Sequence, residues 1–385
     1  MKILYLHSVP LDAEKANVLQ VLHMCNTFTR LGHEVILGAP FGGATEGLES
    51  LAAKRLGQPS VDFSVFGFRR FRVAGRLNSL GGAIPAVLKV RGAEPDVVFL
   101  RNEWMLTLLP TRGRDVIFES HNPFPHATNR WVNGLLIRRI VARARQPNLR
   151  LFVAISNKMR ELWRGRGVPD HKLVAVHDGF DAAMFENPPT REEARRLRSL
   201  PVSQKIVVYT GSLYEDRGIS RIVSLAEHFR DVLFLVVGGP EDRAIRFRDQ
   251  ASARGLENFR LTGRVPHTSI PSYLAAADVL LMVWSRKVPT IDYCSPLKLL
   301  EYLAAGRIVV GDGFPTIHEV VEDGENTFLV EPENDEALRA ALDRALHLER
   351  PEQIQSRARE LAFSKYTWEH RCRLILSYYE ARARS

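Results

Sequence analysis

Cysteine is scarce in this chain of 385 residues, and its placement excludes two kinds of structure. Cys25, Cys294 and Cys372 are odd in number, far apart in the sequence and without metal-ligand spacing. Neither a disulfide framework nor a zinc site of closely spaced ligands is therefore expected. Such sparing use of cysteine is typical of a reducing compartment, and a cytoplasmic location is predicted.

Long apolar runs are also lacking. The longest, at residues 232–237 and 275–284, fall well short of the roughly 20 residues that span a bilayer. The strand-like run at residues 1–7 is followed at once by Pro10 and Asp12, so it does not resemble a signal peptide. We expect a soluble protein, or one attached only peripherally to the inner face of a membrane.

Several sequence signatures are missing as well. No Gly-x-Gly-x-x-Gly fingerprint follows the first predicted strand, which argues against a dinucleotide-dependent enzyme. There is no low-complexity tract and no repeat at solenoid spacing. What the chain does have is length, with 45% hydrophobic residues, and this is enough material for two hydrophobic cores.

Positive charge is concentrated in residues 130–166, where nine arginines and one lysine accompany a single acid, Glu161. Such an excess matches anionic lipid, an acidic acceptor or nucleic acid, but no nucleic-acid-binding motif accompanies it, and no nucleic acid partner is expected. A solvated helix face would explain the charge equally well.

The same segment predicts a basic amphipathic helix that could dock to an anionic membrane. The competing interpretation packs its apolar face into the protein and leaves the arginines solvated. The predicted apolar face and its basic neighbours are Val132, Leu135, Leu136, Ile140 and Val141, beside Arg138, Arg139, Arg143 and Arg145.

Short apolar runs alternate with helical patterns along the whole chain, which predicts an α/β fold with parallel sheets. The predicted strands of the first half are residues 2–7, 34–39, 96–100, 115–119 and 151–155, and those of the second half are 205–210, 232–238, 259–262 and 279–283. We expect two Rossmann-like domains. Their predicted bounds are 1–185 and 205–366, with a proline-rich linker at 186–204 and a last helix, 367–385, that crosses back to the first domain.

The most informative stretch begins at Ser295. Serine favours the N-cap, Pro296 suits the first helical position, and Gly306 is a natural terminator. The amides at the start of such a helix would bind an anion such as a diphosphate. Glu301, a turn and a half further on, could accept the hydroxyls of a ribose. The alternative is a well-capped core helix with a solvent-facing glutamate.

Polar residues end other predicted strands at the edge where α/β sheets bind ligands. In the second half these are the loop of Gly211, Ser212 and Arg217, and Arg264 after the strand 259–262. Arg217 could donate to a phosphate, although an exposed loop arginine is the simpler interpretation.

The first half offers a similar set. His121 follows the strand at 115–119 and could bind a sugar hydroxyl, although a single histidine is more often structural. Arg101 and Glu103 follow the neighbouring strand, with the same ambiguity. Ala16 and Asn17 precede the first helix, and Asn17 is better explained as an N-cap than as a catalytic residue.

Taken together, these stretches resemble the retaining, nucleotide-sugar-dependent glycosyltransferases of family 4, or glycosyltransferase group 1. The resemblance covers nearly the whole chain and is most specific at residues 295–306, Ser-Pro-Leu-Lys-Leu-Leu-Glu-Tyr-Leu-Ala-Ala-Gly. It implies the GT-B fold, in which two Rossmann-like domains face each other across a deep cleft.

The resemblance also implies roles for particular residues. His121, Arg217 and Lys298 would be catalytic, with His121 contacting the transferred sugar and Glu301 holding the ribose. Residues implied to bind the donor are Gly211, Ser212, Arg217, Arg264, Val265, Ser295, Pro296, Leu297, Lys298 and Glu301. Ala16, Asn17, Glu103 and Tyr293 are further candidates for the cleft.

The sequence departs from the family pattern at two of these positions. Tyr293 stands where many members have a glutamate, eight residues before the one that matches Glu301. Ser212 stands where an arginine is common after the loop glycine. The first departure affects the handling of the donor sugar's hydroxyls, and the second leaves Arg217 and Lys298 to carry more of the diphosphate charge.

The function implied is transfer of a hexose-type sugar with retention, as in polysaccharide biosynthesis. The donor would be a UDP-sugar, or else a GDP-sugar, and the acceptor a glycan, a lipid-linked molecule or a small molecule. No metal and no other cofactor is expected. Two alternatives remain: a nucleotide-sugar epimerase of similar fold, and a non-catalytic partner subunit of a glycosyltransferase.

Overall fold

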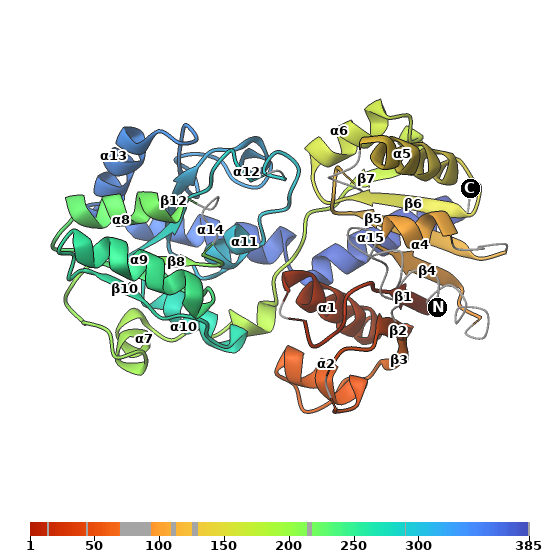
Figure 1. Cartoon of the computed structure of the whole chain (residues 1–385), viewed down its shortest axis with the longest axis horizontal. Helices are drawn as coiled ribbons and strands as arrows, with labels where there is room; N and C mark the ends of the chain where they lie inside the picture. Colours follow the sequence, from red (N-terminus) through yellow and green to blue (C-terminus); the bar gives the residue numbers. More distant parts are fainter. Residues whose placement is uncertain are drawn as a thin grey trace. The chain divides into compact units, whose positions relative to one another are not determined.

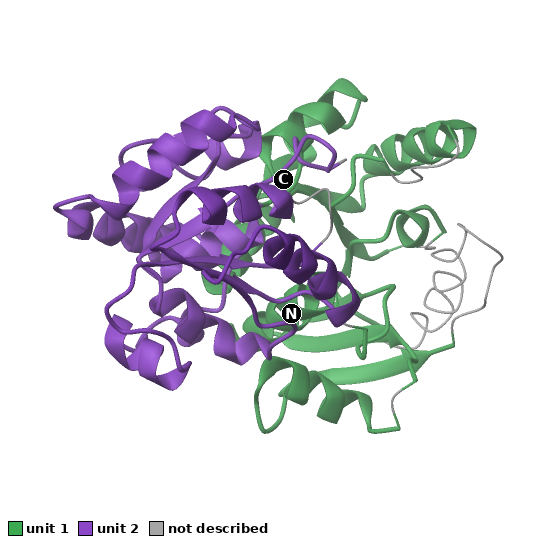
Figure 2. Ribbon diagram, turned by 60° about the vertical axis from the view of Figure 1, so that its left-hand side comes forward, with its two compact units in different colours: residues 1–178, 293–295, 368–385 green, residues 179–292, 296–367 purple. Residues whose placement is uncertain are grey.

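The structure is a computed structural model that describes residues 1–13, 15–43, 45–69, 94–108, 113–124, 130–213, 218–288 and 290–383. These residues form two compact units, coloured separately in Figure 2. Unit 1 comprises residues 1–178, 293–295 and 368–385, and unit 2 comprises residues 179–292 and 296–367.

Unit 1 is built on a parallel sheet of seven strands in the order β3-β2-β1-β4-β5-β6-β7. Its central strands are continuous apolar runs, buried because helices lie on both faces of the sheet (Figure 1). The strands are β1 (Lys2–Leu6), β2 (Glu34–Pro40), β3 (Ser64–Phe68), β4 (Val97–Leu100), β5 (Asp115–Ser120), β6 (Leu149–Ala154) and β7 (Leu173–Ala175). The α-helices are α1 (Ala16–Arg30), α2 (Leu48–Leu56), α4 (Glu103–Leu108), α5 (Arg130–Ala144), α6 (Asn157–Gly165) and α15 (Trp368–Ala383).

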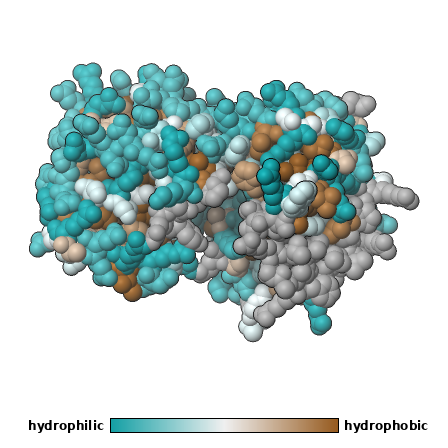
Figure 3. Space-filling view, turned by 45° about the horizontal axis from the view of Figure 1, so that its top comes forward, coloured by the Kyte–Doolittle hydropathy of each residue, from teal (hydrophilic) through white to brown (hydrophobic). Residues whose placement is uncertain are grey.

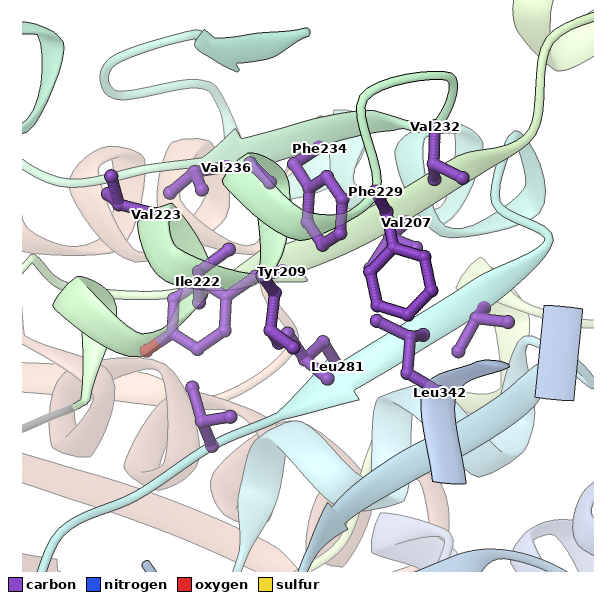
Figure 4. Packing of buried hydrophobic residues seen from close by; sticks show 14 of the residues in the cluster. Val207, Tyr209, Ile222, Val223, Phe229, Val232, Phe234, Val236, Leu281 and Leu342 are labelled. Atoms are coloured by element: carbon purple, nitrogen blue, oxygen red, sulfur yellow. The ribbon is translucent and has the colours of Figure 1, made fainter. Parts of the chain in front are cut away.

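Unit 2 repeats the design with six parallel strands in the order β10-β9-β8-β11-β12-β13. The strands are β8 (Ile206–Thr210), β9 (Leu233–Val237), β10 (Phe259–Leu261), β11 (Val279–Met282), β12 (Ile308–Asp312) and β13 (Phe328–Val330). The α-helices are α7 (Arg191–Leu197), α8 (Ile219–His228), α9 (Glu241–Ala253), α10 (Ile270–Ala275), α11 (Leu297–Ala304), α12 (Pro315–His318), α13 (Asp335–Leu346) and α14 (Pro351–Lys365). Figure 4 shows side chains from its strands packed against α8 and α13 in one core cluster.

Strand order reverses once in each sheet. In unit 1 this happens between β1 and β4, where Ile3 pairs with Val97, and in unit 2 between β8 and β11, where Val207 pairs with Val279. The connections leave in opposite directions at such a point, so the carboxyl ends of the strands are open to a ligand.

The segment predicted as a linker is instead a packed part of unit 2. Thr190 and Glu193 form a capping box that starts α7. Arg195 is buried, and its guanidinium contacts Asp278 at 2.6 Å and the carbonyl oxygen of Ala276 at 3.0 Å. Residues 179–185, predicted in the first domain, also group with unit 2.

The last helix, α15, belongs to unit 1. It packs on α1 and β6, and the rings of Trp368 and His23 are stacked at 5.8 Å. Cys372 and Ile375 of this helix are completely buried.

The predicted amphipathic face in residues 130–145 is only partly right. Leu136, Ile140 and Val141 are buried in the core of unit 1, whereas Leu135 is exposed. Arg143 is also buried, and it donates to the side chain of Asn148 at 3.0 Å. The main apolar face therefore packs inward, as the competing interpretation had it. No helix in the described ranges combines the length and hydrophobicity needed to cross a bilayer.

Candidate functional site

Glycines follow the carboxyl ends of the three neighbouring strands β8, β9 and β10 of unit 2, and their backbones are hydrogen-bonded across this edge. Gly211, after β8, donates its N–H to the carbonyl oxygen of Val237, and Gly238, after β9, donates to that of Gly263, both at 3.0 Å. A Cβ on Gly238 would lie 2.6 Å from the carbonyl oxygen of Gly211. A side chain here would clash with backbone, so glycine keeps this edge open and close-packed.

Lys298 brings a positive charge to this edge. It lies in the first turn of α11, and its Nζ is 3.7 Å from the centre of the Tyr209 ring. A Cβ on Gly211 would lie 3.1 Å from the same Nζ, and Gly211 has a φ of 145°, which disfavours other residues. The ammonium is therefore held beside the loop after β8, at a helix N-terminus, and both features favour an anionic ligand.

Glu301 lies one turn further along α11 and is paired with His267. The glutamate Oε1 and the histidine Nε2 are 2.8 Å apart, and the two side chains are 21% and 35% exposed. Burial lowers the pKa of His267, but the hydrogen bond and charge of Glu301, together with the charge of Asp181, outweigh it and raise that pKa. Within the described ranges Oε2 of Glu301 has no hydrogen-bond partner. That oxygen can accept a ligand hydroxyl.

The predicted cap of this helix is wrong. Ser295 accepts the N–H of Asp178 with its Oγ at 2.9 Å, both within unit 1. The helix begins at Leu297 with Pro296 at the cap position, and the carbonyl oxygen of Pro296 accepts the N–H of Leu299 at 2.8 Å. The Ser295 hydroxyl therefore binds backbone of unit 1 and does not cap α11.

Three other predicted donor residues follow strands β8 and β10. Ser212 and Val265 are partly buried, and Arg264 is exposed. Arg217 falls in residues 214–217, outside the described ranges. Tyr293 groups with unit 1: its carbonyl oxygen accepts from Ser156 Oγ at 2.8 Å.

Unit 1 has its own polar cluster at the carboxyl end of β5. Glu119, at 0% exposure, accepts from Arg371 at 2.6 Å, and its other oxygen contacts His121. The amide of Gln20 donates to Asp178 at 2.6 Å and to Glu119 at 3.1 Å. Four of these five residues are almost completely buried, so the network is a preorganised part of the unit.

The charges of this cluster define the state of His121. Burial opposes ionisation of Glu119, but Arg371 and His121 hold the pKa of Glu119 well below its usual range. Burial and the charge of Arg101 lower the pKa of His121, against the opposing effect of Glu119. A neutral His121 that donates from Nε2 to the carboxylate keeps Nδ1 as an acceptor, which suits a sugar hydroxyl.

Neighbouring residues at this edge refine the predictions. Asn17 and Ala16 lie inside the first turn of α1, whose cap position is Lys15, so the interpretation of Asn17 as the N-cap is wrong. The carbonyl oxygen of Asn17 accepts from Arg101 at 3.2 Å. Glu103 opens α4 and is partly buried, and its desolvation raises its pKa to about 7 despite the charge of Arg101.

Glu119, His121 and Asp178 are the described residues whose ligand atoms are grouped closely enough, within 4.8 Å, to hold a metal ion. Arg371 and Gln20 already donate to their oxygens, and the guanidinium would repel a cation. The donor set does not fit a metal.

Five residues of these sites were not predicted from the sequence: Gln20, Glu119, Asp178, His267 and Arg371. Gln20 and Arg371 lie among the buried, mostly apolar residues of α1 and α15. A polar residue at such a position is the sequence signal from which a buried contact could have been predicted. Glu119 is the last residue of a predicted strand, whereas Asp178 and His267 have no local pattern that distinguishes them.

Two family models match the chain, one described as Glycosyltransferase Family 4 over residues 18–183 and one described as Glycosyl transferases group 1 over residues 190–361. A protein of Escherichia coli strain K12, named as a colanic acid biosynthesis glycosyl transferase, is 27% identical over 201 residues, or 50% of this chain and 49% of that protein. The chain spans about half the length of the curated relatives it matches.

Solved structures match over the whole chain. Anabaena Alr3699/HepE in complex with UDP-glucose has a TM-score of 0.75 at 18% identity and covers 99% of this chain and 100% of its own. Sucrose-phosphate synthase from Thermosynechococcus elongatus has a TM-score of 0.78 at 16% identity, with 100% of both chains covered. The chain therefore has the GT-B fold and belongs to the group 1 glycosyltransferases.

Proposed function

We propose that the chain transfers a hexose-type sugar, with retention, from a nucleoside diphosphate donor to a glycan, lipid-linked or small-molecule acceptor. The observation that carries the proposal is the pair of Lys298 and Glu301 on one face of α11, beside Gly211. Residues three apart lie on the same side of a helix. A cation and a hydroxyl acceptor are thus one turn apart, as a diphosphate and its ribose require.

A UDP-sugar is favoured as the donor, with a GDP-sugar as the alternative. The GT-B neighbour Alr3699/HepE was solved with UDP-glucose, and its fold matches this chain throughout. Unit 2, which holds Lys298 and Glu301, coincides with most of the match to the group 1 model.

In the proposed reaction, the bond from the anomeric carbon to the diphosphate oxygen breaks while the acceptor oxygen bonds to the same face of the sugar. The acceptor's proton passes to the departing phosphate oxygen. Lys298 stabilises the negative charge that builds up on this leaving group, and Arg217 is proposed as a second cation. His121 accepts a hydrogen bond from a hydroxyl of the transferred sugar through Nδ1.

We propose that no metal takes part in this scheme and that the reaction occurs in the cytoplasm. Activity should therefore survive EDTA, whereas its full loss and recovery with magnesium or manganese would refute the metal-free scheme.

The experiment that tests the function combines donor screening with product analysis. UDP-, GDP- and ADP-sugars are assayed for binding, slow hydrolysis and transfer, and the anomeric configuration of the product is read by proton NMR. Retained configuration with a UDP-sugar supports the proposal. An inverted glycoside contradicts retention, free epimerised sugar indicates an epimerase, and binding without turnover indicates a non-catalytic subunit.

A further inference from the structure

The outer side of α5 carries a stripe of exposed residues that unit 1 does not cover. Trp131 is 89% exposed and Leu135 is 53% exposed, and Arg138, Ala142 and Arg145 continue the line as exposed residues. The spacing alternates between four and three residues, so these side chains share one side of the helix. Buried Ile140 lies on the opposite side.

Apolar and basic residues are separated along this stripe. The apolar pair Trp131 and Leu135 lies in the first half of α5. Arg138 and exposed Arg139 lie in its second half, and Arg145 directly follows its last residue. Figure 3 shows hydrophobic and strongly hydrophilic residues side by side on the part of the molecule where Figure 1 labels α5. An exposed tryptophan and leucine on one helix are costly in water, so this surface suits a partner.

The basic end continues into a groove of about 550 Å³ at the amino ends of β6 and β7. Its lining includes Arg145, Arg150, Lys172 and Arg382 and contains no acidic residue. Lys172 and Arg382 also bind backbone carbonyl oxygens, of Gln146 and His171, at 2.6 Å each. The groove lies at the opposite sheet edge from His121, so it is separate from the proposed sugar site.

Charge complementarity decides between the possible partners. Residues 130–145 contain five arginines and no acid. The same face of a second copy would bring like charges together, whereas anionic lipid offers phosphates for the arginines and an apolar layer for the tryptophan. Tryptophan is also favoured at the membrane–water interface.

We propose that this stripe, formed by Trp131, Leu135, Arg138, Ala142 and Arg145, docks on an anionic membrane. Trp131 and Leu135 enter the headgroup layer, and the arginines contact lipid phosphates. The docking goes beyond the proposed sugar transfer and does not depend on it.

The test measures co-sedimentation of the full chain, without any donor, with vesicles of phosphatidylcholine alone or mixed with phosphatidylglycerol. We expect binding to the anionic vesicles at about 0.05 M salt and its loss at about 1 M, where the Debye length falls to about 3 Å. This arm needs no variant. Equal binding to both vesicles, or no binding to the anionic ones at low salt, would overturn the proposal.

Two variants locate the surface. Combining Arg138→Gln, Arg139→Gln and Arg145→Gln should weaken binding about 100-fold. The loss of each arginine should lower the membrane affinity by roughly tenfold or slightly less. Combining Trp131→Ala and Leu135→Ala should weaken it about tenfold or more at every salt concentration. These side chains are exposed, so the melting temperature should not change.

The matched control lies on α9 of unit 2, where Ile245 is 49% exposed beside exposed Arg246. Ile245→Ala combined with Arg246→Gln should bind like the wild type. Full binding by both α5 variants would overturn the proposal. Self-association that the α5 variants abolish, in the absence of lipid, would do so as well, because the face would then serve a second copy.

Discussion

At the scale of single residues, one oxygen of Glu301 contacts His267 and the other can accept a ribose hydroxyl. Glu301→Gln should weaken UDP binding by about 1–3 kcal/mol, since the charged acceptor is lost. Isothermal calorimetry measures this directly, with exposed Glu257→Gln as the control. Unchanged affinity in a folded Glu301→Gln protein would exclude the ribose role.

The same pair predicts a pH dependence of stability. The pKa of His267 is higher in the folded protein than in the unfolded chain. The ion pair with Glu301 therefore contributes its full stabilisation below about pH 6.5, and this contribution is lost as the pH rises through the pKa of the folded state. We expect the melting temperature to fall as the pH increases above about 6.5. Glu301→Gln should flatten that decline, and an identical decline in both proteins would contradict the assignment to this pair.

Lys298 should act mainly in the transition state. Its ammonium lies at the proposed diphosphate position, where charge grows as the leaving group departs. Lys298→Met should therefore reduce kcat more than it reduces donor affinity, by about tenfold or more. Steady-state kinetics combined with calorimetry separates the two effects. Equal losses would indicate that Lys298 binds the ground state and the transition state alike.

At the scale of secondary-structure elements, α7 is held to unit 2 by Arg195. This side chain is 2% exposed and joins Asp278 to the carbonyl oxygens of Val202 and Gln204. Arg195→Leu should destabilise the protein by about 3 kcal/mol or more, because it leaves these buried groups without their donor. Urea unfolding measures the loss.

The neighbouring Arg196 is the matched control for that prediction. It is exposed and contacts only Glu192, at 3.3 Å, within the described residues, so Arg196→Leu should cost about 0.5 kcal/mol or less. Equal effects of the two substitutions would mean that residues 186–204 behave as a linker after all.

At the scale of the whole molecule, the last helix is a structural part of unit 1. Arg371 of α15 compensates Glu119 at 2.6 Å and Asp178 at 3.7 Å, both buried. Removing residues 368–385 should unfold unit 1, because two buried carboxylates would lose their counter-charge and the apolar surface of α1 would be exposed. Unit 2 should remain folded and keep its affinity for UDP.

Circular dichroism and UDP calorimetry on the truncated chain test this together. Loss of part of the helical signal with retained UDP affinity is the expected result. Retention of all structure would show that α15 is dispensable, and loss of UDP binding would show that the two units fold as one.

The sequence by itself determined the fold class and most of the strands, although β3, β7, β12 and β13 were not predicted. Apolar runs such as residues 232–237 have to be buried on two faces, and they became the central strands of parallel sheets. The start of the helix after Ser295 was predicted to within a residue or two, because helix signals are local. The family resemblance then implied further roles for residues of this helix, which remain predictions.

Only the tertiary structure decided which distant residues meet. Glu119 and Arg371 are 252 positions apart, and Gln20 and Asp178 are 158 apart. The packing of Arg195 on Asp278 makes the predicted linker part of unit 2, and the packing of α5 decided which of its sides faces the core. Hydrophobic periodicity shows that a side is buried, but the partner of a buried charge is set by chain topology, since it can come from any element that packs there.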